Sequence, residues 1–271
     1  MCLYPRMLNV KRKGKDVRET VQVACGNCVE CLSKRAREWS FRIVDESNLY
    51  KDNCFITLTY DKAHYPQDGN VNKRDIQLFL KRLRKKIAPQ KIRYFYCGEY
   101  GEKRGRPHYH MIIFGWLPSD IYKFFIDDDG VVHYRSKMIE DLWQNGYILI
   151  TKDITLETAL YSASYMQKLN VSDNKQGTAK QFVQMSNRPG IGARAFDEKS
   201  LVTDKLVIAG KSINLPRYYL KLAEADGWNL TEFHDRRMQI AEIADMNSLQ
   251  ELNKRRAKAF DFINKKITKK S

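Results

Sequence analysis

Apolar side chains recur at helical spacing in several parts of the chain, most clearly in Lys73–Ile87. Here the apolar residues fall along one side of an α-helix: Ile76, Phe79, Leu80, Leu83 and Ile87. The opposite side carries basic residues that either face water or contact a nucleic-acid backbone: Lys81, Arg82, Arg84, Lys85 and Lys86. We predict further helices over residues 30–49, 121–125, 139–143 and 155–169, and over most of the chain from Leu215 onward. Asp153 or Thr155 would cap the helix over 155–169.

Segments rich in β-branched and aromatic residues predict the strands. They are CFITLTY (54–60), IRYFYCGEY (92–100), HYHMIIFGW (108–116) and GYILIT (146–151). The second and third flank the turn GEKRGRP (101–107) and are expected to form a hairpin. Strands and helices follow one another without regular alternation, which favours an α+β fold with an antiparallel sheet over a doubly wound one.

The charge of the chain narrows the choice of partner. Lys and Arg total 48 against 32 Asp and Glu, giving +16 and an isoelectric point near 9.5. This balance favours a polyanionic partner, most often nucleic acid, although a ribosome-like basic protein has the same charge. The 15 tyrosines suit single-stranded nucleic acid, whose bases stack on aromatic rings. No apolar run is long enough to cross a bilayer and no signal segment follows Met1, so we expect a cytoplasmic protein without a membrane partner.

Two histidines one residue apart give the hairpin candidate chemistry. On a strand, His108 and His110 project from the same face while Tyr109 projects from the other. Alone, such a pair is as well explained as two surface histidines. Glu99 precedes His108 by nine residues across the turn and would lie opposite one of the two histidines. A carboxylate and two imidazoles form an open site suited to Mg²⁺ or Mn²⁺ when the substrate is a phosphate, although Glu102 and Asp61 are nearby alternative carboxylates.

The helix over 155–169 offers a nucleophile. Tyr161 and Tyr165 are four residues apart and share a helix face, which Lys168 joins. Tyrosine pairs in helices are usually packing residues. Here, however, the apolar stripe lies roughly on the opposite side: Leu156, Ala159, Leu160, Ala163 and Met166.

These motifs resemble those of a known family. HYH resembles the His-hydrophobe-His signature of HUH endonucleases, Tyr161-x-x-x-Tyr165 the two-tyrosine motif of their rolling-circle initiators, and FITLTYD (55–61) their first motif strand. More closely, the chain resembles the replication initiation proteins of gokushovirus-like microviruses, which are small single-stranded DNA phages. The ordered segments that carry this likeness reach to about Leu222: CGNCVECLSKRAREWSFRI, KRDIQLFLKRLRKK, GEYGEKRGRPHYHMIIFG, SNRPGIG and LPRYYLK.

The resemblance implies a sheet of about five antiparallel strands with flanking helices, and a reaction that nicks and rejoins single-stranded origin DNA. A metal held by His108, His110 and Glu99 would polarise the phosphate. One tyrosine would form a 5′-phosphotyrosyl link and free a 3′-hydroxyl for the host's helicase and polymerase, in the cytoplasm of an infected bacterium. The second would act after one round of synthesis, and Lys168 would steady a tyrosinate or a phosphate oxygen. Which tyrosine acts first is left open.

The expected organisation has three parts. Residues 1–50 form a Cys-rich segment and helix packed on the nuclease, residues 51–222 form the nuclease core, and residues 223–271 form a helical basic extension. Lysines near the end of the chain would add affinity by counterion release. Arginines in the hairpin turn and in SNRPGIGARAF (186–196), which is expected to be a loop, are candidate DNA contacts: Arg104, Arg106, Arg188 and Arg194.

Four cysteines predict a second metal site. Cys25, Cys28 and Cys31 stand at Cys-x-x-Cys-x-x-Cys spacing, and Cys2 can supply a fourth thiolate. A closed Cys₄ zinc site would be structural. Reduced thiols at the helix end and an iron–sulfur cluster are the alternatives, and a reducing compartment disfavours disulfides.

Two other functions fit part of the pattern. A non-enzymatic nucleic-acid-binding protein would use HxH as a structural metal site, but it has no need for two tyrosines on one helix face near a metal. A relaxase or transposase of the HUH class would share the site but not the order of the segments.

Overall fold

The computed structural model describes residues 2–11, 18–101, 104–152, 154–168, 179–197, 205–208, 211–233, 235–236, 239 and 253–259. The chain divides into two compact units. One comprises Ala36–Val202, and the other combines Met1–Arg35 with Thr203–Ser271. Among the described helices, none combines the length and the apolar character that a membrane crossing requires.

A single antiparallel sheet forms the centre of the unit Ala36–Val202. Its seven strands are, in spatial order, β6 (Tyr122–Ile126), β7 (Val132–Arg135), β8 (Gly146–Thr151), β3 (Asn53–Tyr60), β5 (Pro107–Phe114), β4 (Arg93–Tyr100) and β9 (Phe182–Met185). Every neighbouring pair is antiparallel. This confirms the α+β class and the predicted hairpin, and the sheet has seven strands where about five were expected.

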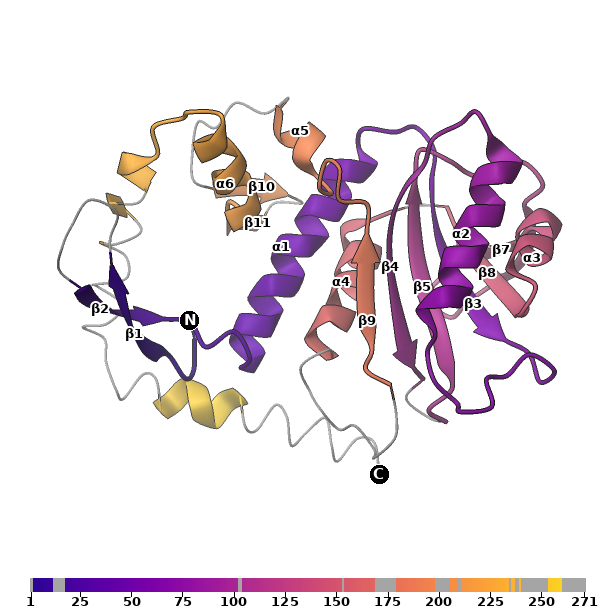
Figure 1. Cartoon of the computed structure of the whole chain (residues 1–271), viewed down its shortest axis with the longest axis horizontal. Helices are drawn as coiled ribbons and strands as arrows, with labels where there is room; N and C mark the ends of the chain where they lie inside the picture. Colours follow the sequence, from indigo (N-terminus) through magenta and orange to yellow (C-terminus); the bar gives the residue numbers. More distant parts are fainter. Residues whose placement is uncertain are drawn as a thin grey trace. The chain divides into compact units, whose positions relative to one another are not determined.

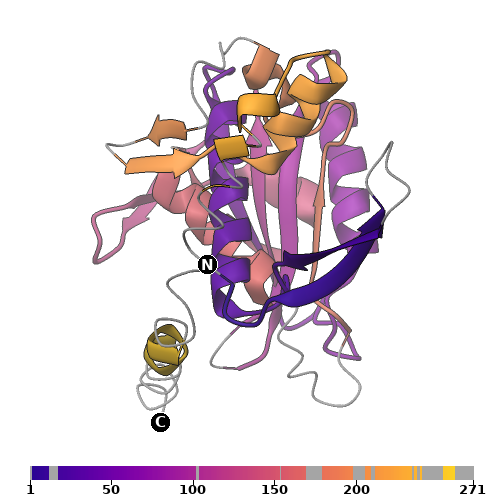
Figure 2. The same cartoon turned by 90° about the vertical axis from the view of Figure 1, so that its left-hand side faces the viewer.

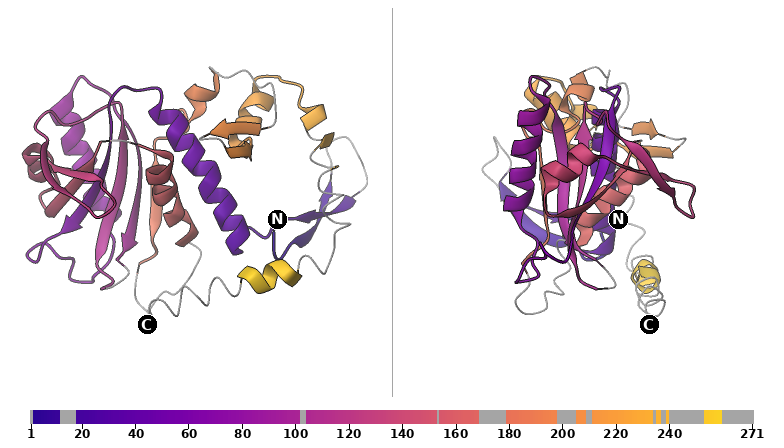
Figure 3. Two further views of the ribbon diagram at one scale, coloured as in Figure 1. Left: turned by 180° about the vertical axis from the view of Figure 1, so that it is seen from behind. Right: turned by 90° about the vertical axis from the view of Figure 1, so that its right-hand side faces the viewer.

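The prediction of a helix over residues 121–125 is wrong, because this segment is the edge strand β6. All five residues of β6 are exposed, so no apolar helix face is buried here. Three of them are aromatic and one is β-branched, which favours an extended strand. A turn at Gly130, whose φ of 79° suits glycine, returns the chain into β7. The β6–β7 hairpin therefore lies at one edge of the sheet (Figure 3).

Helices cover both faces of the sheet. The helices α2 (Lys73–Ile87) and α3 (Lys137–Trp143) lie on one face, where their apolar residues pack against alternate residues of β3 and β5. The helices α1 (Val29–Ser47) and α4 (Leu156–Lys168) lie on the other face (Figure 1). The alternation of β5 assigns His108, His110 and Ile112 to the α4 face, and Tyr109 and Met111 to the α2 face.

The predicted apolar stripe of α2 is confirmed, since Ile76, Phe79, Leu80 and Leu83 are buried. The side chain of Asn72 caps the helix by accepting a hydrogen bond from the backbone N–H of Arg74. One residue of the basic side has a structural role: the Arg82 guanidinium donates to the carbonyl oxygens of Leu142 and Trp143 at the end of α3. The other four basic residues of this side are exposed.

The second unit contains two short hairpins and further helices. The strands β1 (Arg6–Lys11) and β2 (Arg18–Val23) pair antiparallel and form the indigo hairpin in Figure 2. The strands β10 (Lys205–Ile208) and β11 (Lys211–Asn214) form the other hairpin, and α6 (Arg217–Ala225) follows. Residues 253–259 are also helical, as predicted for the end of the chain, and the rest of that predicted region falls partly outside the described residues.

Candidate metal and tyrosine site

Strand pairing brings one carboxylate to the two histidines. Glu99 of β4 lies directly opposite His108 of β5, and Cys97 lies opposite His110. The alternative Asp61 is paired elsewhere, because it accepts hydrogen bonds from the backbone and ring of His64. Glu102 lies outside the described residues. Among the carboxylates considered from the sequence, Glu99 is therefore the one that the described structure places with the histidines.

The three side chains form a compact group of potential ligand atoms. Glu99 Oε1 lies 2.8 Å from His108 Nε2 and 3.2 Å from His110 Nε2. One ligand atom from each residue lies within 4.8 Å of the other two. Glu99 and His110 are buried and His108 is partly exposed. A cation bound here would have protein ligands on one side and access to a substrate on the other.

Hydrogen bonds to the other ring nitrogens orient both histidines. His108 Nδ1 lies 3.1 Å from the carbonyl oxygen of Arg106, which can only accept, so Nδ1 carries a hydrogen. A neutral His108 then presents the lone pair of Nε2 to Glu99, and two acceptor atoms at 2.8 Å require a proton or a metal cation between them. Thr57 Oγ1 lies 3.1 Å from His110 Nδ1. Such partners are typical of metal-binding histidines, and the donor set fits a divalent cation.

The helix α4 places Tyr161 beside this group. Thr155 is the N-cap, since its Oγ1 accepts a hydrogen bond from the N–H of Thr158 at 3.2 Å; Asp153, the other candidate cap, lies outside the described residues. Ala159 and Ala163 are buried against the sheet. The Tyr161 ring lies edge-on to His110, with 5.5 Å between ring centroids, and is 51% exposed. The phenol therefore borders both the candidate metal ligands and the solvent.

The second tyrosine and the lysine of the motif are only partly described. Tyr165 and Lys168 belong to α4, which ends at Lys168. Their side chains lie outside the described residues. The helical backbone places Tyr165 one turn after Tyr161 and on the same side of the helix.

Two of the four arginines lie at the triad's end of the sheet. Arg104 is exposed in the β4–β5 turn. Arg106 is partly buried, donates to the carbonyl oxygen of Tyr60 and lies over the Tyr65 ring. Since its own carbonyl oxygen contacts His108, Arg106 also supports the site.

The other two arginines lie elsewhere. Arg188 and Arg194 are exposed in the segment after β9, where Ser186 pairs with Tyr94. Tyr94 precedes Glu99 by five residues, roughly 16 Å along a strand. The segment is held by a buried structural network in which Glu46 pairs with Arg93 and accepts from the N–H of Gly192. It also contains the helix α5 (Ala193–Asp197), so the expectation of a loop is only partly correct.

Further residues around the site emerge only from the register of the sheet. Phe55 of β3 stacks on His110 with 5.5 Å between ring centroids, and Thr57 holds the same imidazole. Tyr147 of β8 lies opposite Thr59, which in turn lies opposite His108. The Tyr147 side chain is 60% exposed on the face that carries the histidines. FITLTYD contains the first two of these residues, but their partners depend on strand order.

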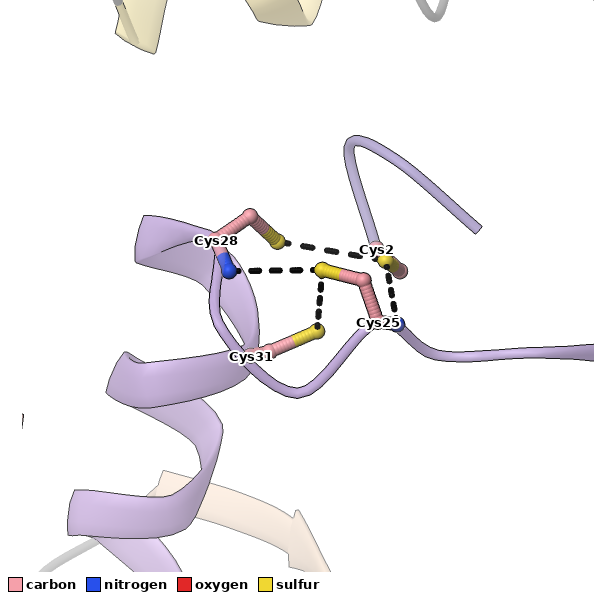
Figure 4. A group of neighbouring side chains, drawn as sticks. All are labelled: Cys2, Cys25, Cys28 and Cys31. Carbon is pink, nitrogen blue, oxygen red and sulfur yellow. Dashed lines mark hydrogen bonds between the residues drawn. The ribbon is translucent and has the colours of Figure 1, made fainter. Parts of the chain in front are cut away.

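The four predicted cysteines also come together (Figure 4). The sulfur atoms of Cys2, Cys25, Cys28 and Cys31 all lie within 4.8 Å of one another. Backbone hydrogen bonding, with Asn27 the main contributor, lowers the pKa of Cys25 to about 6. Burial raises the pKa of Cys31 to about 12. The environment therefore differs among the four thiols.

Fold and site define an antiparallel α+β protein with a Glu-His-His group and a tyrosine helix on one sheet face. The family model for the replication-associated protein ORF2 matches residues 53–170, which include this whole group. Comparison with solved structures gives no match.

Three phage proteins are similar in sequence. Replication-associated protein VP4 of Bdellovibrio phage phiMH2K is 33% identical over 207 residues, covering 72% of this chain and 65% of the relative. Replication-associated protein ORF4 of Chlamydia phage 1 is 31% identical, covering 78% and 57%. Replication-associated protein ORF2 of Spiroplasma virus 4 is 32% identical, covering 81% and 74%. The chain belongs to this family of phage replication-associated proteins, although it spans less than two thirds of the first two relatives.

Proposed function

We infer that this protein initiates and terminates rolling-circle replication of a phage genome by nicking and rejoining single-stranded DNA. The family membership supports a role in phage replication. The observation that carries the chemistry is the 5.5 Å separation between the rings of Tyr161 and His110, which places a phenol beside a candidate metal site. A protein that only binds nucleic acid does not require this juxtaposition.

In the proposed reaction the Tyr161 or Tyr165 oxygen attacks the scissile phosphorus after losing its proton. The new P–O(Tyr) bond forms as the P–O3′ bond breaks, and the 3′-oxygen leaves as a hydroxyl after taking up a proton. The 5′-phosphate stays on the tyrosine, so a phosphodiester-type bond is conserved for rejoining. The other tyrosine can then accept the newly synthesised junction, and a free 3′-hydroxyl closes the released circle.

The residues divide this work between them. Glu99, His108 and His110 would hold Mg²⁺ or Mn²⁺, which when bound supplies charge to polarise the phosphate. Thr57 and the Arg106 carbonyl keep the two imidazoles in place. Lys168 is assigned to a tyrosinate or phosphate oxygen.

A track for the single strand can be proposed along the same sheet face. Glu99, His108, Thr59 and Tyr147 form one row across four strands. Two strand spacings, about 10 Å, separate Tyr147 from His108. A base next to the scissile phosphate can therefore stack on the exposed Tyr147 ring. Arg104 would contact the backbone near the turn, Arg188 and Arg194 would contact DNA farther away, and the net charge of +16 adds salt-dependent affinity.

The partners follow from the chemistry. The liberated 3′-hydroxyl serves as a primer, so the host's polymerase and a helicase are the proposed collaborators in the cytoplasm of the infected bacterium. These assignments depend on the nicking reaction and are tested with it.

The reaction is tested with single-stranded oligonucleotides that tile the genome encoding the chain, incubated with Mn²⁺. We expect an SDS-resistant adduct that retains a 3′-end label, and a released fragment that carries the 5′-end label and can be extended by a polymerase. Peptide mapping identifies the attacking tyrosine. The variant Tyr161→Phe with Tyr165→Phe should form no adduct, and Tyr147→Phe, which retains the ring, serves as the control. An adduct that persists in the double variant would refute the nucleophile assignment. Sequence-independent binding without any adduct would favour the non-enzymatic alternative.

A further inference from the structure

The cysteine cluster has the dimensions of a single-ion site. The sulfur atoms of Cys2 and Cys28 are 3.9 Å apart, and those of Cys25 and Cys31 are 4.0 Å apart. A tetrahedral zinc ion with Zn–S bonds of about 2.3 Å separates its sulfur ligands by about 3.8 Å. All four thiols are free. We propose that Cys2, Cys25, Cys28 and Cys31 bind one structural zinc ion.

Backbone geometry around the sulfurs supports thiolate ligands. The backbone N–H groups of Cys28, Cys25 and Leu3 donate to the sulfurs of Cys25, Cys2 and Cys28, at 3.3, 3.1 and 3.4 Å respectively. Gly26, with φ of 79°, makes the tight turn between the first two ligands of the CGNC segment. This turn directs successive N–H groups towards sulfur, as a site with negative thiolates requires.

Two further features offset the charge of four thiolates. Cys28 directly precedes the 19-residue helix α1, and Cys31 lies in its first turn, where the helix dipole favours negative charge. Arg35 donates to the Gly26 carbonyl oxygen, and Arg256 donates to that of Leu3, so two guanidinium groups lie close to the ligand-bearing segments.

The site has a structural and not a catalytic role because protein sulfurs fill all four positions. The loop between Cys2 and Cys25 contains both strands of the β1–β2 hairpin. Met7 and Leu8 of this hairpin are 61% and 48% exposed, so these side chains bury little apolar surface. An isolated two-stranded hairpin is marginally stable. The ion would close the base of the hairpin and join it to the start of α1, so that metal binding contributes directly to local folding.

The first test measures metal content in a background that lacks the other candidate site. The full chain with His108→Ala and His110→Ala is purified, and bound metal is measured by native mass spectrometry and elemental analysis. We expect one zinc per chain. Adding Cys31→Ala should reduce this to none, whereas adding Cys54→Ala, the removal of a buried thiol outside the cluster, should leave one. Zinc retained in the Cys31→Ala chain, no zinc in the background chain, or an iron chromophore in place of zinc would each overturn the proposal.

The second test needs no cysteine substitution and is therefore independent of misfolding. The unmodified chain is alkylated with iodoacetamide before and after chelation, and each cysteine peptide is quantified. The four cluster thiols should be protected before chelation and modified after it. Hydrogen exchange should accelerate in β1 and β2 on chelation and stay unchanged in β5. Equal alkylation in both conditions would show that these thiols bind no ion, and unchanged exchange in β1 and β2 would refute the structural role. Neither test depends on DNA nicking.

Discussion

Glu99 and His108 face each other across the β4–β5 ladder, with 2.8 Å between Glu99 Oε1 and His108 Nε2. The imidazole presents an acceptor to this oxygen unless it is protonated, because its Nδ1 donates to the Arg106 carbonyl oxygen. A buried carboxylate in this position attracts either a proton or a metal ion. The sheet thus supplies a cation site through register alone, and α4 adds a phenol beside it.

The charge of Glu99 is the first property to test. Glu99→Gln keeps the shape of the side chain and removes its negative charge. Loss of a group that only orients a metal ligand already costs about 10–100-fold in metal affinity or activity, so loss of this ligand should reduce the rate of adduct formation by at least about 100-fold. The measurement is adduct yield against Mn²⁺ concentration. Asp61→Asn, which alters an Asp–His pair outside the group, should stay near the unmodified rate. Equal losses in the two variants would contradict the assignment.

Thr57 allows the metal site to be perturbed without touching a ligand. Thr57→Val removes the hydroxyl that lies 3.1 Å from His110 Nδ1, so the imidazole loses its orientation. We expect apparent Mn²⁺ affinity to fall about 10–100-fold, with activity restored at high Mn²⁺ concentration. Isothermal titration and adduct assays measure the two effects.

Thr151→Val is the matched control for Thr57→Val. Thr151 lies on β8, and its buried hydroxyl has no hydrogen-bond partner. Its replacement should leave Mn²⁺ affinity unchanged and should not lower thermal stability. If Mn²⁺ affinity fell equally in both variants, Thr57 would have no special role in orienting His110.

The sequence predicted the elements of the site better than the edges of the fold. Alternation on HYH and helical spacing of the tyrosines are local properties, and both placed side chains on the correct faces. The choice of Glu99 over Asp61 required the register between β4 and β5, which a turn containing Glu102 and Lys103 did not specify. Tyr147 and Thr57 were missed as site residues because their neighbours belong to strands far away in the sequence.

The errors have similar causes. The segment 121–125 contains apolar residues at positions that also fit a helix turn, and its pairing with β7 decided for a strand. The short strands β7 and β9 carry no strong periodicity, so the sheet gained strands that the pattern did not indicate. The cysteine spacing, in contrast, was sufficient to predict a four-sulfur cluster.

Tyr147 tests the proposed DNA track. Stacking of one base on an aromatic ring contributes about 1–3 kcal/mol, so Tyr147→Ala should weaken binding of a single-stranded oligonucleotide by roughly 5–150-fold. Tyr147→Phe should bind normally because it keeps the ring. Tyr122→Ala removes another exposed tyrosine, on the edge strand β6, and should have little effect. Fluorescence anisotropy at fixed salt measures all three. Equal weakening by Tyr147→Ala and Tyr122→Ala would point to a general aromatic surface and against a track beside the metal site.

The buried pair of Glu46 and Arg93 should control stability without contributing to the chemistry. Glu46 binds Arg93 through Oε1 and the N–H of Gly192 through Oε2, and its side chain is fully buried. Glu46→Ala leaves the Arg93 guanidinium buried without its carboxylate, which costs about 3–5 kcal/mol. Urea unfolding should show this loss as a lower midpoint. Glu46→Met combined with Arg93→Met removes both charges and should be less destabilised than Glu46→Met alone. If the double variant were the less stable of the two, the pair would contribute net stability beyond the avoidance of an unpaired charge.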